Sequence, residues 1–229
     1  LSFGHSKAPE TIVNSVRELQ PGHYLWVDKN GNWEEKEYWN PFNENESPVH
    51  EMGIHEQVRT LIEESVRCRS ISDVPLGAFL SGGIDSSLIL YYMQKNSTKK
   101  INTYTLGFKG AKKHDETSDA KIVSDAFCTN HKEIIIDPKV AELLPKMVNH
   151  FGEPFASPTG MLIYELTKEA KKISTVALAG DGGDEIFGGY PKYKAVMVAH
   201  NLRIVPRFIW RVMANIVKNI PESEKGGNV

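Results

Sequence analysis

The stretch Leu76-Gly-Ala-Phe-Leu-Ser-Gly-Gly-Ile-Asp-Ser-Ser-Leu88 has the pattern of a buried strand, a glycine turn and the start of a helix, and the rest of the chain can be placed relative to it. Its first five residues form a short apolar run typical of a central parallel strand, and an apolar segment of helical length opens at Ser86. A turn containing Gly82 and Gly83 ahead of a helix directs several backbone N–H groups at one point, which suits an anion such as phosphate. Ser-Gly-Gly also occurs in ordinary loops, so an ordinary loop stays as the alternative for this stretch alone.

The polar side chains of this turn indicate which anion it binds. The hydroxyls of Ser81, Ser86 and Ser87 add donors to the backbone N–H groups. Asp85 would repel a phosphate unless a cation lay between them, so it predicts Mg²⁺ bridging carboxylate and phosphate oxygens. The Lys-Ser/Thr ending of the Walker loop is missing, and the usual NTPase motif therefore does not apply.

A second glycine-rich stretch, Gly180-Asp-Gly-Gly-Asp-Glu-Ile-Phe-Gly-Gly-Tyr190, comes after another predicted strand. Its carboxylates Asp181, Asp184 and Glu185 would repel one another without a counter-ion, which indicates a metal or base cluster. Parallel strands present their carboxyl ends at the same edge of a sheet, so we expect Asp184 to face Asp85 and complete a Mg²⁺–phosphate site. The alternative for this stretch is a solvated acidic turn.

The rest of the chain alternates predicted helices and strands. Helices are predicted from residue 54, after Ser86, and over residues 115–128, 140–151 and 161–172; further strands are predicted at 101–108, 133–136 and 175–179. This alternation predicts an α/β fold with a doubly wound parallel sheet that binds its ligands at the carboxyl ends of the strands.

Residues 1–46 differ in character from the remainder of the chain. Tyr24–Val27 and Trp33–Trp39 are aromatic-rich strand candidates joined by Asp28-Lys-Asn-Gly-Asn32, which predicts a β-hairpin, and residues 40–48 read as a polar linker. A two-stranded piece cannot hold itself folded, so we expect it to lean on residues later in the chain or on a partner domain.

Composition excludes several classes of function. The chain has 229 residues, 40% of them hydrophobic and 24% charged, with a formal net charge of −2 and no long block of like charges, so neither a nucleic-acid nor a membrane surface is predicted. No apolar run reaches the length that spans a membrane. Cys68 and Cys128 fit no metal spacing and are predicted to be buried thiols in a reducing compartment, the cytoplasm.

The two glycine-rich stretches together resemble a known family. Ser81–Ser87 resembles the pyrophosphate loop of the ATP pyrophosphatase group, and Gly180–Tyr190 is similar to the second signature of its asparagine synthetase branch. The resemblance covers residues 47–200, and Arg17–Trp39 is similar to the tail of the family's N-terminal glutaminase domain. It therefore implies two parts: residues 1–46 as that tail and a linker, and residues 47–229 as a partial synthetase domain.

The resemblance implies a glutamine-hydrolysing asparagine synthetase. ATP would adenylate the side-chain carboxylate of aspartate, or of a similar acid, with loss of pyrophosphate, and ammonia from a glutaminase domain missing here would then displace AMP. Asp85 and Asp184 would ligate Mg²⁺, and Asp181 stands where the family often has a Glu proposed to take a proton from the attacking amine. Carried over by position, the pyrophosphate ligands would be Ser81, Gly82, Gly83, Ser86 and Ser87, and the adenosine site would be lined, mostly through backbone, by Leu80, Leu106, Gly107 and Gly180.

Several departures from the family leave alternatives open. Residues 153–159 are expected to form the loop over the acyl substrate, and Ser157 stands where relatives often carry Asp, which leaves the identity of the acid open. The chain has no early cysteine nucleophile, and a lysine that usually supports pyrophosphate would fall beyond Val229, so this piece alone is expected to be inactive or feeble. The alternatives are an amidotransferase or β-lactam-forming synthetase that adenylates another carboxylate, and a non-catalytic nucleotide-binding module. A homodimer is compatible with the resemblance.

Overall fold

The structure is a computed structural model that describes residues 6, 8–42, 53–108, 115–136, 140–152 and 159–201. Contacts divide the chain into two compact units, Leu1–Ala179 and Gly180–Val229. Most of the expected linker, and Ser157 with nearly all of the expected substrate loop, lie outside the described residues.

A four-stranded parallel sheet forms the centre of the first unit. Its strands are β3 (Leu76–Phe79), β4 (Asn102–Phe108), β5 (Asn130–Ile136) and β6 (Val176–Leu178), in the order β5-β4-β3-β6. Every neighbouring pair is parallel, which confirms the predicted sheet. The chain moves from β3 through β4 to β5 and then crosses back to place β6 on the other side of β3. The direction of strand order therefore reverses between β3 and β6.

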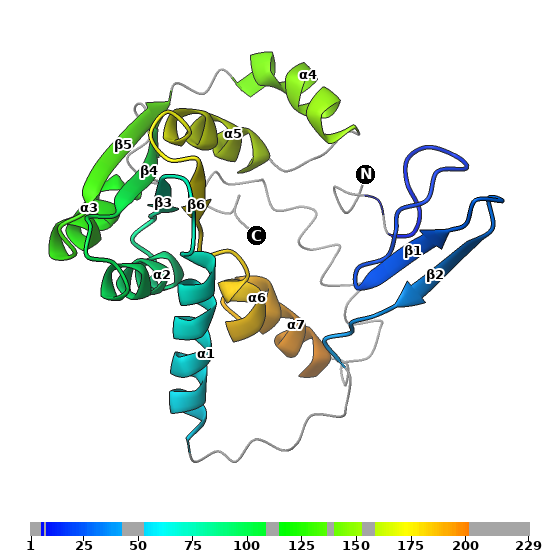
Figure 1. The fold of residues 1–229 in the computed structure, drawn as a ribbon, viewed down its shortest axis with the longest axis horizontal. Helices are drawn as coiled ribbons and strands as arrows, with labels where there is room; N and C mark the ends of the chain where they lie inside the picture. The colour runs from blue at the N-terminus through cyan, green and yellow to red at the C-terminus, as the bar shows by residue number, and fades with distance from the viewer. Residues whose placement is uncertain are drawn as a thin grey trace, which may run out of the picture. The chain divides into compact units, whose positions relative to one another are not determined.

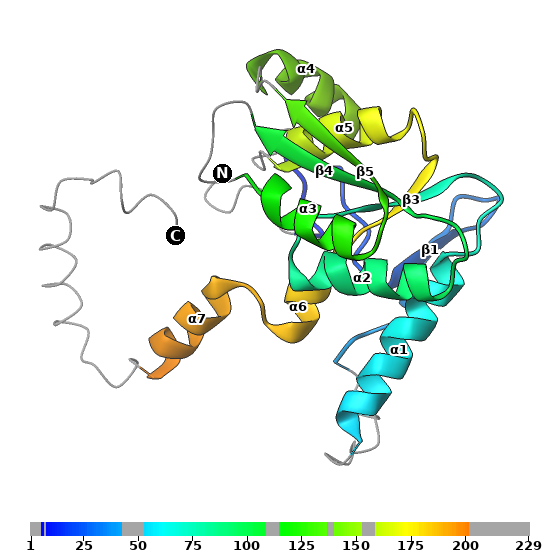
Figure 2. The ribbon, with the colours of Figure 1, turned by 90° about the vertical axis from the view of Figure 1, so that its left-hand side faces the viewer.

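Helices cover both faces of this sheet, as Figures 1 and 2 show. The helices are α1 (Ile54–Arg69), α2 (Ile84–Lys95), α3 (Thr117–Ala126), α4 (Val140–Phe151) and α5 (Thr159–Ala170). On one face α2 contacts β3 and α3 contacts β4 and β5, while α5 contacts β4 and β5 from the other face. α1 packs on α2 and α4 packs on α5. Each predicted helix is therefore present, with ends within a few residues of the prediction.

The apolar core consists of two clusters, one on each face. The larger cluster joins the sheet to α1, α2 and α3 through Val66, Ala78, Leu80, Leu90, Tyr92, Met93, Ile101 and Ala120. The smaller cluster joins the sheet to α5 through Tyr104, Ile134 and Ala170. Side chains that alternate along β4 point to opposite faces, so Tyr104 joins the smaller cluster while the buried polar residues Thr103 and Thr105 lie on the other face.

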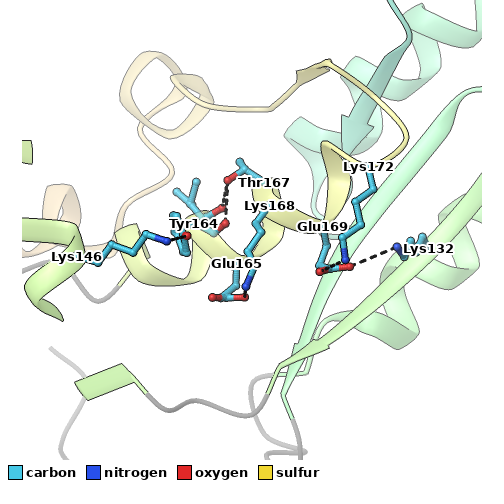
Figure 3. Close-up of polar contacts among 9 residues, drawn as sticks. Lys132, Lys146, Tyr164, Glu165, Thr167, Lys168, Glu169 and Lys172 are labelled. Atoms are coloured by element: carbon cyan, nitrogen blue, oxygen red, sulfur yellow. Dashed lines mark hydrogen bonds and ion pairs between the residues drawn. The ribbon is translucent and has the colours of Figure 1, made fainter. Parts of the chain in front are cut away.

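Polar contacts link α5 to β5 and α4, as Figure 3 shows. Glu169 lies 3.7 Å from Lys132 of β5 and 2.5 Å from Lys172, and the hydrogen bond from Lys172 lowers the pKa of Glu169 below its ordinary value. Lys146 of α4 donates to the hydroxyl of Tyr164. Solvent screens the charges of these side chains, so the main support of α5 is its apolar face. α5 then delivers the chain to β6.

The predicted hairpin is confirmed. β1 (His23–Val27) pairs antiparallel with β2 (Trp33–Glu37). Asp28 shapes the turn, because its carboxylate accepts the N–H groups of Asn30 at 2.8 Å and Asn32 at 2.9 Å. Gly31 adopts φ +84°, the left-handed conformation that favours glycine.

The second unit opens with two helices that the sequence pattern did not predict. They are α6 (Gly183–Phe187) and α7 (Pro191–Asn201). Gly182 before α6 and Gly188 after it have φ values of +92° and +70°, so glycines define both ends of α6.

The two cysteines lie at the surface of the protein. Cys68 and Cys128 are free thiols, but both are exposed, so the prediction that they are buried is wrong. Cys68 lies near the end of α1 and Cys128 just after α3, where the helices leave the core. Within the described ranges, no helix combines the length and apolar character that a membrane crossing needs.

Candidate nucleotide-binding site

The predicted phosphate loop lies where the strand order reverses. β3 and β6 are parallel neighbours, with Ala78 opposite Leu178, so the chain leaves both strands at the same edge of the sheet. In open α/β sheets, ligands bind outside the carboxyl ends of the strands at such a reversal. The stretch after β3 therefore lies where proteins with open α/β sheets bind their ligands.

Hydrogen bonds of the Ser81 and Ser86 hydroxyls stabilise the turn between β3 and α2. The Ser86 hydroxyl oxygen accepts the backbone N–H of Ser81 at 3.2 Å and donates to the carbonyl of Gly83 at 3.3 Å. The Ser81 and Ser86 hydroxyls lie 3.0 Å apart, and the Ser81 hydroxyl accepts the N–H of Gly83 at 3.2 Å. Ser86 is only 7% exposed. Both hydroxyls are thus engaged in shaping the turn, a role that sequence reasoning did not assign to them.

Gly82 is the tightest point of the loop. Its φ is +81°, and a Cβ there would lie 2.6 Å from the carbonyl carbon of Asp119 and 2.7 Å from the nitrogen of Ala120. The first turns of α3 therefore lie directly against the loop, and only glycine fits between them. Asp115 supports this helix end, because its carboxylate accepts the N–H of Thr117 at 3.1 Å.

The loop offers unused donors to a phosphate. The first N–H groups of α2 have no partner within the helix and point outward at its start, with Asp85 in the first turn. The Ser87 hydroxyl is buried and has no hydrogen-bond partner in the described part of the chain. An unpartnered hydroxyl beside a helix start fits an anionic ligand, so these residues are suited to phosphate oxygens.

The predicted adenosine contacts of the first unit lie at the ends of β3 and β4. Leu80 is 2% exposed, its N–H donates to the carbonyl of Tyr104 at 2.9 Å, and its carbonyl accepts the hydroxyl of Thr105. Gly107 is in close contact with β5 and α3, because a Cβ there would lie 2.6 Å from Ile135 and 2.8 Å from Thr117. Sequence reasoning missed Thr105, which reads as an ordinary strand residue.

In the second unit, Asp184 packs against a glycine. A Cβ on Gly189 would lie 1.8 Å from the Asp184 carboxylate oxygen, and the N–H of Gly189 donates to the Asp184 carbonyl at 3.0 Å. Gly180 accepts the N–H of Gly183 at 3.3 Å through its carbonyl, which turns the chain into α6. Asp181 is exposed.

Glu185 differs from the other two carboxylates of this stretch. It accepts the hydroxyl of Tyr190 at 2.8 Å, a bond that lowers the pKa of Glu185 and raises the pKa of Tyr190 to about 12. Lys192 lies 4.4 Å from the centre of the Tyr190 ring. Glu185 thus has a hydrogen-bond partner within its own unit. This makes Glu185 a weaker candidate for a metal ligand than Asp181 or Asp184.

The donors available to a metal ion are few. No cluster of three or more His, Cys, Asp or Glu side chains suited to a metal exists among the residues that the structure describes. Mg²⁺ usually binds one or two carboxylates together with substrate phosphates and waters, so Asp85 and Asp184 are a donor set of the right kind. Asp85 belongs to the first unit and Asp184 to the second, and their shared ion stays a prediction.

A polar pocket of about 530 Å³ lies at the opposite edge of the sheet. It is lined by Leu76 and Asn102 at the starts of β3 and β4, by Lys99, and by the ends of α1 and α2. Because this is the amino-terminal edge of the strands, the pocket is separate from the phosphate loop.

A glycine loop with internally bonded serines, at the reversal point of a parallel sheet, defines a class of α/β nucleotide-binding proteins. Comparisons with known proteins give the family. The family model described as asparagine synthase matches residues 57–225, and the chain belongs to this family.

Two curated relatives agree with this assignment. The chain is 34% identical over 229 residues to "Asparagine synthetase [glutamine-hydrolyzing] 1" of Bacillus subtilis (strain 168), covering 99% of this chain and 35% of the relative. It is 33% identical over 210 residues to "Putative asparagine synthetase [glutamine-hydrolyzing] 2" of Methanocaldococcus jannaschii, covering 91% of this chain and 40% of the relative. A solved glutamine-dependent NAD⁺ synthetase from Acinetobacter baumannii, in complex with ADP, aligns with 63% of this chain and 29% of its own, at 18% identity and a TM-score of 0.42. The chain thus spans little more than a third of the length of these two curated relatives.

Proposed function

We propose that this chain supplies the ATP-binding and adenylating part of a glutamine-dependent asparagine synthetase. The observation that carries the proposal is the Ser81–Ser87 loop, whose hydroxyl bonds and unpartnered donors lie at the reversal point of the sheet in a member of the asparagine synthase family. Supporting this, the names of both relatives describe glutamine-hydrolysing asparagine synthetases.

In the first step, an oxygen of the aspartate side-chain carboxylate attacks the α-phosphorus of ATP. The bond between the α- and β-phosphates breaks, which gives β-aspartyl-AMP and pyrophosphate. The N–H groups at the start of α2 and the Ser87 hydroxyl stabilise the charge that develops on the leaving pyrophosphate. Asp85 and Asp184 would hold Mg²⁺, which would supply positive charge beside the leaving group.

In the second step, ammonia attacks the acyl carbon of β-aspartyl-AMP. The carbon–oxygen bond to AMP breaks, and asparagine and AMP are released. Asp181 accepts the proton that the attacking nitrogen loses. Asp181 is exposed, which leaves its carboxylate free for this role.

The ammonia comes from glutamine, hydrolysed by a glutaminase part of the protein. A cytoplasmic location belongs to this proposal, because Cys68 and Cys128 are both free thiols.

The direct test is pyrophosphate release by the protein in its natural full length, with ATP, Mg²⁺ and ammonia, across a panel of carboxylic acids. Aspartate is expected to give the highest kcat/KM, with one AMP and one asparagine formed for each pyrophosphate. Asp85→Asn should lower that rate by about 100-fold or more, because the leaving group loses its metal-held charge stabilisation. Release that is faster with another acid would reassign the substrate, and ATP binding without pyrophosphate release with any acid would contradict the ligase.

A further inference from the structure

The ladder between β3 and β4 ends in an unusual way at Leu80. The N–H of Leu80 donates to the carbonyl of Tyr104 at 2.9 Å, so Thr105 is the residue opposite Leu80. In a parallel ladder, a residue bonds the neighbours on either side of its opposite residue. The carbonyl of Leu80 would therefore accept the N–H of Leu106 if the two strands continued.

A side chain takes that place instead. The Thr105 hydroxyl donates to the Leu80 carbonyl, in a site where both residues are only 2% exposed. Leu80 is the last residue before the phosphate loop, so this bond fixes the point at which the chain turns away from the sheet. By the alternation of the ladder, the N–H of Leu106 faces β3. It therefore loses the Leu80 carbonyl as its regular acceptor, at the edge of the sheet where the nucleotide is expected.

We propose that Thr105 is a positioning residue for ATP: it caps the Leu80 carbonyl and so keeps the Leu106 N–H available to a ring-nitrogen acceptor of adenine. The inference rests on the proposed function for its ligand, and on the strand register for its geometry. A backbone N–H donor suits a ring nitrogen of a purine because the hydrogen bond is directional. Leu106 lies at the carboxyl edge of the sheet, beside the phosphate loop. Thr105 itself acts through Leu80 and Leu106.

Thr103 offers a matched control on the same strand. It is 0% exposed and two residues from Thr105, so the two side chains lie on the same face. Its hydroxyl lies 2.8 Å from the Thr129 hydroxyl and 2.9 Å from Nδ1 of His131, at the opposite end of β4. Thr103→Val thus removes a buried hydroxyl network without touching the Leu80 carbonyl.

Hydrogen exchange tests the capping without any nucleotide. The full-length protein is exchanged and the Leu106 amide is resolved by mass spectrometry with fragmentation to single residues. In Thr105→Val the Leu80 carbonyl is left with the Leu106 N–H as its donor, so exchange at Leu106 should slow by about tenfold. Thr103→Val and Thr105→Ser should leave it unchanged. Equal exchange in the wild-type and Thr105→Val proteins would overturn the proposal.

Calorimetric titration with ATP tests the consequence. Thr105→Val should weaken ATP binding by about tenfold, because the Leu106 N–H must first leave the Leu80 carbonyl. Thr103→Val should stay within about twofold of the wild type, and Thr105→Ser should restore affinity. Equal affinities for the two valine variants would overturn the inference, whereas a wild-type protein that does not bind ATP would contradict the proposed function and leave the exchange result to decide the capping. Thr105→Ala repeats both measurements if the valine variant does not fold.

Discussion

The side chain of Ser86 holds the backbone of Ser81: its hydroxyl accepts the Ser81 N–H at 3.2 Å, across the glycine turn that separates β3 from α2. The Ser87 hydroxyl beside it is buried without a partner in the described residues. Neighbouring serines of one motif therefore differ: the Ser86 hydroxyl is bonded within the loop, and the Ser87 hydroxyl has no partner among the described residues.

Alanine substitutions should separate these roles. Ser86→Ala leaves a part-buried N–H without its acceptor and should lower the free energy of unfolding by about 1–2 kcal/mol, and ATP affinity with it. Ser87→Ala removes an unpartnered hydroxyl, so unfolding should change by less than about 0.5 kcal/mol while ATP binding weakens. Urea unfolding and calorimetric titration measure the two effects. A Ser87→Ala protein that binds ATP as the wild type does would exclude the hydroxyl as a phosphate ligand.

The contact between Gly82 and α3 gives a second prediction. Gly82→Ala forces a Cβ to within 2.6 Å of the backbone of Asp119 at φ +81°, and should destabilise the fold by about 3 kcal/mol and abolish ATP binding. Gly152→Ala is the control, because Gly152 has φ +77° but nothing within 4 Å of its Cβ position. It should cost only about 1 kcal/mol of conformational strain. Equal losses of stability in the two variants, measured by thermal unfolding, would show that backbone strain, and not the contact with α3, makes glycine necessary at position 82.

Most of this fold is predictable from hydrophobic periodicity. The pattern predicts the helix at Val140–Phe151 with its observed ends, and the strand at Asn102–Phe108 to within one residue. The pattern misses the helix at Gly183–Phe187, because glycines flank this helix and begin it, and glycine is a poor helix former. The role of each glycine depends on backbone angles that a hydrophobic pattern does not show.

The site is predictable as a set of residues and less so as a set of roles. The types and spacing of Ser81, Gly82 and Gly83 indicate a phosphate loop, and the structure confirms that they form a turn between strand and helix. Which hydroxyl turns inward depends on packing, so Ser86 and Ser87 cannot be distinguished in sequence. Thr105 carries no motif, since its role depends on which strand lies beside it.

Gly189 gives a prediction for the second stretch. Its Cβ would lie 1.8 Å from the Asp184 carboxylate oxygen, so Gly189→Ala should turn that carboxylate aside and raise the Mg²⁺ concentration needed for half-maximal ATP binding. A side-chain end can move, so unfolding should change by less than about 1 kcal/mol. Gly188→Ala meets only Tyr193 at 4.0 Å, although its φ is +70°, and should keep the wild-type Mg²⁺ requirement. An unchanged requirement in Gly189→Ala would argue against Asp184 as a ligand.

His131 makes stability depend on pH. Burial lowers its pKa below 6.5, so the unfolded chain binds a proton more readily than the folded one. The stability that neutral His131 contributes is present above pH 6.5 and declines as the pH falls toward the folded-state pKa. The melting temperature should therefore drop between about pH 7.5 and 5.5, and His131→Gln should drop less. An identical drop in both proteins would assign the effect to other groups.

We propose that Asp85 and Asp184 hold one Mg²⁺ for a single bound ATP. Calorimetry of Mg²⁺-dependent ATP binding by the full-length wild type, Asp85→Asn, Asp184→Asn and the double variant tests this proposal. We expect each single variant to lose most of the Mg²⁺ dependence and the double variant to lose little more, because both carboxylates serve the same ion. Losses that simply add, or a variant that keeps the full Mg²⁺ dependence, would contradict a shared ion and the ligase proposed around it.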